Sequence, residues 1–83
     1  MSVEKDTDAP LTSVEVRATE LIVLELQNDG GMSKYELYAR LERKHGIPPT
    51  AYQRAVRHLY NRPRDKVGLE DQGEIVNLRR RRA

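Results

Sequence analysis

The sequence predicts a small α+β domain, mostly α, in which three helices are followed by a C-terminal β-hairpin. Three observations carry this prediction: two repeated helix-start patterns, a proline-led helix with one polar face, and a late change to strand-like periodicity. The 83 residues suffice for one core but not for two. We expect a disordered lead-in over residues 1–11, one domain over residues 12–79 and a basic tail over residues 80–83.

The first helix is predicted over residues 13–27. Thr12 and Glu15 have the spacing of a capping box, in which each residue satisfies a backbone N–H near the helix start. Gly30 and Gly31 follow the helix and permit the left-handed turn that ends many helices. The helix therefore has a local signal at both ends.

This first helix carries two apolar stripes at helical spacing. One can face the core of the domain and consists of Ala18, Ile22, Val23 and Leu26. The second is a candidate homodimer face and consists of Val14, Leu21 and Leu24. The alternative is a core that wraps around much of the helix, and the sequence leaves both interpretations open.

The second and third helices are predicted over residues 34–44 and 49–62. Ser33 and Glu36 repeat the capping-box spacing, and Gly46 supplies the glycine expected after a helix end. Pro49 suits the first turn of a helix, where its missing N–H would have no partner, and Pro63 ends the third helix.

The third helix has the most informative composition. Its predicted inner face comprises Tyr52, Val56, Leu59 and Tyr60, with Ala55 at the margin. Its outer face comprises Thr50, Gln53, Arg54, Arg57, His58 and Asn61. Solvated helix faces normally mix positive and negative charges, but this face has no acid, which favours an anionic, base-bearing partner over simple solvent exposure.

The periodicity changes after residue 65. Residues 66–70 and 74–79 are short runs with β-branched side chains, and residues 71–73 join them through a glycine-containing loop. This pattern predicts a β-hairpin.

Helix, turn, helix, proline turn, polar-faced helix and hairpin, in this order, resemble the winged helix-turn-helix superfamily. The resemblance covers residues 12–79 and rests on element order and face composition. It implies that the third helix enters the DNA major groove, that the second helix abuts the backbone and that the hairpin forms a wing. Winged helices also bind proteins, so the resemblance leaves the partner open.

Carried onto this chain, the resemblance predicts a sequence-specific double-stranded DNA-binding protein, either a small transcriptional regulator or an accessory factor of a mobile element. The expected base-reading residues are Thr50, Gln53, Arg54, Arg57, His58 and Asn61. The expected phosphate contacts are Ser33, Lys34, Arg62, Arg64, Lys66, Arg79, Arg80, Arg81 and Arg82.

The charge is unevenly distributed along the chain. The net charge of +2 divides into −5 over residues 1–33 and +7 over residues 34–83. Such asymmetry is typical of proteins with a polyanionic partner, although a charged surface also serves solubility.

The acidic hairpin tip departs from the DNA-binding pattern, because Glu70, Asp71 and Glu74 would be repelled by phosphates. Either the tip is held away from the duplex, with Lys66 and Arg79 making the contacts, or it binds a protein. The alternative function is therefore a winged-helix protein-interaction module that uses the acidic first helix and the acidic wing tip.

Other functions have little support. The chain has no cysteine, its two histidines lie apart on different elements, and it has no glycine-rich phosphate loop, so we expect no enzyme activity, cofactor or metal. The four tyrosines have helical spacing with aliphatic residues and are expected in the core. The longest apolar run, Leu21 to Leu24, is far too short to span a membrane, and no leader pattern is present. We expect a cytoplasmic protein, associated with the nucleoid if it binds DNA.

Overall fold

The computed structural model describes residues 10–63 and 65–79. These residues form three helices, α2 (Ser13–Asp29), α3 (Lys34–His45) and α4 (Pro49–Tyr60), and three strands, β1 (Met32–Ser33), β2 (Gly68–Gln72) and β3 (Ile75–Arg79). The predicted fold class, mostly helical with a C-terminal hairpin, is confirmed. Residues 1–9 of the predicted lead-in, Arg64 and the basic tail with Arg80, Arg81 and Arg82 lie outside the described residues.

The helix ends follow the local signals, with small corrections. Thr12 and Glu15 form the full capping box: the Thr12 N–H donates to Glu15 Oε1 at 2.9 Å, and the Glu15 N–H donates to Thr12 Oγ1 at 3.2 Å. Gly30, at a φ of 71°, caps α2 as expected, and the helix ends at Asp29, two residues later than predicted. The second box is only half formed, because Ser33 Oγ accepts the Glu36 N–H while the Glu36 carboxylate accepts from Arg40.

The sheet is antiparallel, with strand order β1-β3-β2. Strand β1 was not predicted. Met32 pairs with Val76 and Ser33 with Ile75, so β1 joins the sheet along the edge of β3 that does not pair with β2. The predicted loop at 71–73 is wrong, because Asp71 and Gln72 belong to β2 and the turn consists of Gly73 and Glu74. Helix α4 likewise ends at Tyr60, two residues earlier than predicted.

The core lies where the three helices meet the sheet. It is built from Ala18, Leu21, Ile22, Leu26, Met32, Leu37, Leu41, Ile47, Ala51, Ala55, Leu59, Leu69 and Val76. On α4 the most deeply buried residues are Ala51, Ala55 and Leu59, so Ala55 is central to the inner face and not marginal. The small side chains of the two alanines allow α4 to approach α2 closely. The larger Tyr52, Val56 and Tyr60 are only partly buried.

The two stripes predicted for the first helix need correction. Leu21 is 9 % exposed and belongs to the core, whereas Val14 and Leu24 are 44 % and 48 % exposed. Val23, predicted to face the core, is only partly buried. The predicted dimer face is therefore reduced to Val14 and Leu24, and dimerisation through α2 stays a prediction. A charge introduced at Leu21 would enter the core, so that position does not test the interface.

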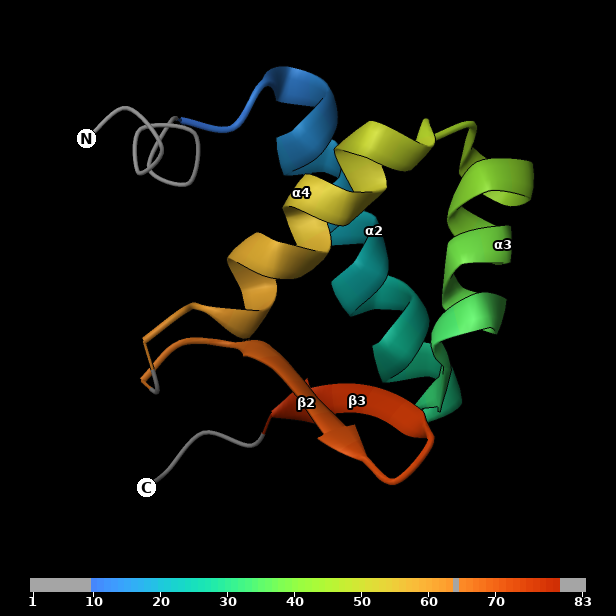
Figure 1. The fold of residues 1–83 in the computed structure, drawn as a ribbon, viewed down its shortest axis with the longest axis vertical. Coiled ribbons are helices and arrows are strands. Elements are labelled where there is room, and N and C mark those ends of the chain that lie inside the picture. The colour runs from blue at the N-terminus through green and yellow to red at the C-terminus, as the bar shows by residue number, and fades with distance from the viewer. Residues whose placement is uncertain (1–9, 64, 80–83) are drawn as a thin grey trace.

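Figure 1 shows how the three helices and the hairpin are arranged. Helix α4 crosses in front of α2, α3 stands beside it, and the hairpin runs across the end of the helices.

Candidate nucleic-acid interface

The outer surface of α4 is the centre of the candidate site. Thr50, Gln53, Arg57 and His58 are exposed, as is Asn61 directly after the helix. Pro49 starts the helix and keeps Thr50 in its first turn, and the buried stripe of Ala51, Ala55 and Leu59 fixes which side points outward. Helix α4 contains no acidic residue. Five of the six predicted base-reading residues therefore share an exposed surface made of hydrogen-bonding and basic groups.

Arg54 is the exception among the predicted base readers. Its side chain is 36 % exposed and its Nη1 lies 3.8 Å from Glu15 Oε1, at the start of α2. The same Glu15 oxygen completes the Thr12 capping box. Arg54 is thus turned toward α2, and base reading by Arg54 stays a prediction that requires this side chain to leave Glu15.

His58 has an altered titration. Partial burial, together with the positive charge of Arg62, lowers its pKa below the ordinary value of 6.5. The imidazole is therefore mostly neutral at pH 7, with one nitrogen that donates a hydrogen bond and one that accepts. A neutral imidazole suits hydrogen bonding to a base edge better than holding a phosphate by charge.

Arg79 was predicted to contact phosphate, but the structure gives it a different task. Its Nη2 donates to the carbonyl oxygens of Arg62 at 3.1 Å, Pro63 at 2.8 Å and Lys66 at 3.1 Å. Its Nε is buried. The side chain therefore joins the end of β3 to the segment that follows α4, where carbonyl groups carry partial negative charge. This guanidinium is already engaged, so a phosphate contact by Arg79 stays a prediction that requires it to exchange these partners.

The other described phosphate candidates divide into two groups. Arg62 is half-buried and donates through Nη1 to the Val67 carbonyl at 3.2 Å, and Lys34 forms an ion pair with Asp71. Ser33 is exposed and caps α3 by accepting the Glu36 N–H, which leaves its hydroxyl proton for another acceptor. Lys66 is exposed just before β2. Ser33 and Lys66 keep donors that a phosphate could use, whereas Lys34 and Arg62 would have to exchange partners.

An apolar groove of about 340 Å³ opens between α3, α4 and the hairpin; it is lined by Lys34, Tyr35, Leu37, Tyr52, Val56, Tyr60, Leu69 and Val76. Burial raises the pKa of Tyr52 to about 12, and the ring of Tyr52 packs edge-to-face on Tyr38 with centroids 5.3 Å apart. Tyr35 differs from the other tyrosines because it is 74 % exposed. The prediction that all four tyrosines belong to the core is therefore wrong for Tyr35.

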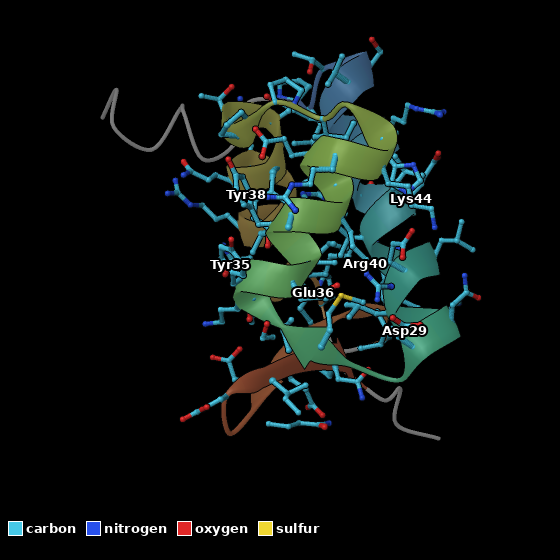
Figure 2. The ribbon with its side chains drawn as sticks, turned by 90° about the vertical axis from the view of Figure 1, so that its right-hand side faces the viewer. Asp29, Tyr35, Glu36, Tyr38, Arg40 and Lys44 are labelled. Atoms are coloured by element: carbon cyan, nitrogen blue, oxygen red, sulfur yellow. The ribbon has the colours of Figure 1, made fainter. Side chains whose placement is uncertain are left out.

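Several acids of the first helix are paired within the protein and do not form a free acidic surface. Glu25 is 2 % exposed and accepts hydrogen bonds from Arg40 Nη1 at 3.2 Å, Lys44 Nζ at 3.1 Å and His45 Nε2 at 3.0 Å. Because an ionised carboxylate has no proton to donate, His45 Nε2 carries the hydrogen in this contact. In Figure 2, Arg40 lies between α3 and α2, with Glu36 on its own helix and Asp29 on α2.

We call Glu25, Arg40, Lys44 and His45 the Glu25 cluster. The hydrogen bond from His45, followed by those from Lys44 and Arg40, outweighs the effect of burial and lowers the pKa of Glu25 from 4.5 to about 2. The carboxylate is therefore ionised at pH 7 and joins α2 to α3. The sequence contained a partial signal for this cluster, because Lys44 and His45 lie in the last turn of α3, but it did not identify the buried acid.

No known family, characterised protein or solved structure was found to match this chain. Among the residues that the structure describes, no group of three or more metal-ligating side chains converges. None of the described helices has the length and apolar character needed to cross a membrane.

Proposed function

We propose that the protein binds double-stranded DNA in a sequence-dependent manner, with α4 in the major groove. The single observation that carries this proposal is the outer surface of α4, where Thr50, Gln53, Arg57, His58 and Asn61 are exposed together on a helix without acids. Arginine pairs in bidentate fashion with guanine, and amide side chains pair with adenine. A helix also has the dimensions that fit the major groove.

The surroundings of α4 support the same proposal. The N-terminus of α3, with Ser33 as its cap, contacts α4 through Lys34, whose carbonyl accepts from the Tyr52 hydroxyl and whose ammonium lies over the Tyr60 ring. The hairpin contacts α4 through the hydrogen bond from Tyr60 to Asp71. A helix N-terminus favours phosphate through its free N–H groups and dipole. A transcriptional regulator or a mobile-element accessory factor would bind DNA through such a surface. A dimer formed through Val14 and Leu24 would bind two DNA half-sites about 34–36 Å apart.

Protein binding is the second candidate, favoured by the exposed Tyr35 beside the apolar groove. The acidic first helix supports this alternative less than the sequence suggested, because Glu15, Glu25 and Asp29 of α2 are paired within the protein. The wing-tip residue Asp71 is paired as well. The groove therefore supports a protein partner better than the acidic surface of α2 does.

Selection of bound duplexes from a random 20-base-pair pool tests the proposed function. At low salt we expect enrichment of a defined sequence, and the affinity for it should fall linearly on a double-logarithmic plot as salt rises. Absence of binding by any duplex at low salt would contradict the proposal and leave the groove as the candidate binding surface.

Arg57→Ala is expected to reduce the preference for the selected duplex over random DNA by about tenfold to a hundredfold, the discrimination of one bidentate base contact. Arg43→Ala is the matched control, because Arg43 is exposed in the last turn of α3 and is not among the residues expected to contact DNA. Arg43→Ala removes the same charge as Arg57→Ala and should change the affinity for the selected duplex and for random DNA equally. Competition titrations measure the two preferences, and equal losses of preference in the two variants would exclude base reading by Arg57.

A further inference from the structure

Asp71 was predicted in the hairpin loop but belongs to strand β2, where it forms an ion pair with α3. It lies within β2 opposite Val76, and its carboxylate accepts hydrogen bonds from the Tyr60 hydroxyl and, at 3.3 Å, from Lys34 Nζ. Lys34 Nζ also lies 5.9 Å from the centroid of the Tyr60 ring. Three elements, α3, α4 and β2, thus place an ammonium group, a phenol hydroxyl and a carboxylate together at the rim of the apolar groove.

The two donors are of the kind that bind phosphate in DNA interfaces, where lysine and tyrosine contact backbone oxygens. Lys34 is the first residue of α3, so the dipole of the helix adds positive potential at the same place. The hydrogen bond from Tyr60 and the charge of Lys34 lower the pKa of Asp71, so the carboxylate is ionised at pH 7. An anion already occupies the position between the two donors.

We infer that Lys34 and Tyr60 form a phosphate-binding site of the DNA interface and that Asp71 fills this site in the free protein. The inference rests on the proposed function. Tyr60 was expected only to face the core, and Lys34 was expected to be a simple phosphate contact. The side chains of Lys34 and Asp71 are 63 % and 50 % exposed, so a phosphate can reach this pair and displace the carboxylate. Asp71 thereby weakens DNA binding until the duplex supplies the anion.

Asp71→Asn removes the competing charge while keeping the size of the side chain and an oxygen that can accept from Tyr60. One phosphate contact, with a salt slope of about 0.9, contributes about fivefold to tenfold in affinity near 0.1 M salt. We expect up to this gain for Asp71→Asn, because the phosphate no longer has to displace an ionised carboxylate. We expect this gain for selected and for random duplexes alike, because phosphate contacts carry no sequence information.

Glu74→Gln is the matched control, since Glu74 lies in the turn of the same hairpin and is exposed. It removes the same charge away from Lys34 and Tyr60, and we expect a gain of about twofold or less from the weaker general field. In a Lys34→Gln background, Asp71→Asn should also gain only about twofold, because the site then lacks its ammonium group. Fluorescence anisotropy with a 20-base-pair duplex over a salt series measures all variants, and circular dichroism establishes that each variant is folded.

The outcomes separate the inference from the function it rests on. Binding by the unaltered protein with equal gains for Asp71→Asn and Glu74→Gln, or a full gain in the Lys34→Gln background, would overturn the phosphate site and leave the function standing. Binding by Asp71→Asn alone would support both. If no variant binds any duplex at low salt, the proposed function fails and the phosphate site fails with it.

Discussion

Replacement of Glu25 by glutamine is expected to lower the free energy of unfolding by about 2–3 kcal/mol at pH 7. The substitution leaves Arg40, Lys44 and His45 without their shared anion, and breaking a buried ion pair from one side typically costs 3–5 kcal/mol. The expected loss is smaller because Lys44 and Arg40 are 61 % and 34 % exposed and can turn toward water. Urea unfolding followed by circular dichroism measures the difference.

The same carboxylate predicts how stability depends on pH. The pKa of Glu25 falls from 4.5 to about 2 on folding, so the folded protein holds the deprotonated form more strongly than the unfolded chain does. This contribution is complete above about pH 4.5 and is lost as the pH falls toward 2. The difference in stability between the native protein and Glu25→Gln should therefore be large at pH 5 and shrink toward zero near pH 2.

Glu36→Gln serves as the control for this cluster. Glu36 is 50 % exposed and accepts from Arg40 Nε at 2.9 Å, four residues further along the same helix. Exposed pairs of this kind contribute about 0.3–0.5 kcal/mol. A loss in Glu25→Gln no larger than the loss in Glu36→Gln would show that the Glu25 cluster does not join α2 to α3 energetically.

Gly68→Ala is expected to destabilise the protein by about 3 kcal/mol. A Cβ at this position would lie 2.6 Å from the Leu59 carbonyl oxygen, 2.7 Å from Arg79 Nη2 and 2.9 Å from Arg79 Cζ. Overpacking of this kind typically costs 1–3 kcal/mol, and the displaced guanidinium would also lose hydrogen bonds to the segment after α4. Urea unfolding again gives the magnitude.

Gly73→Ala is the comparison for this prediction. Gly73 lies at the other end of β2, in the hairpin turn, with a φ of 71° and nothing within 4 Å of an added Cβ. Its replacement should cost only the left-handed backbone, about 1–2 kcal/mol. A cost for Gly68→Ala that does not exceed the cost for Gly73→Ala would mean that β2 moves freely away from α4.

The sequence predicted best what depends on neighbouring residues. Thr12 and Glu15, Gly30, Gly46 and Pro49 define helix ends through contacts within a few residues, and these helices are present. Strand β1 depends on the pairing of Met32 with Val76, far along the chain, and two residues carry no strand pattern of their own. The half-formed box at Ser33 has a similar cause, because Arg40 competes for the Glu36 carboxylate.

The candidate site shows the same division. The helical period alone placed Gln53 and Arg57 on the exposed side of α4, because the inner face of this helix is strongly apolar. The period could not show that Arg54 reaches Glu15 or that Arg79 reaches the carbonyls after α4. A charged side chain is predicted to be solvated unless its partner is known, and these partners are brought near only by the tertiary fold.

The strand order β1-β3-β2 leaves β2 at an edge of the sheet, with one row of backbone groups outside the ladder. Such an edge can accept a strand from a second chain and begin aggregation. Glu70 within β2 and Glu74 in the following turn carry negative charge along this edge. A second copy that aligned its own β2 here would bring like charges together. We therefore expect the acidic hairpin to disfavour self-association by strand addition, a benefit that requires no partner at all.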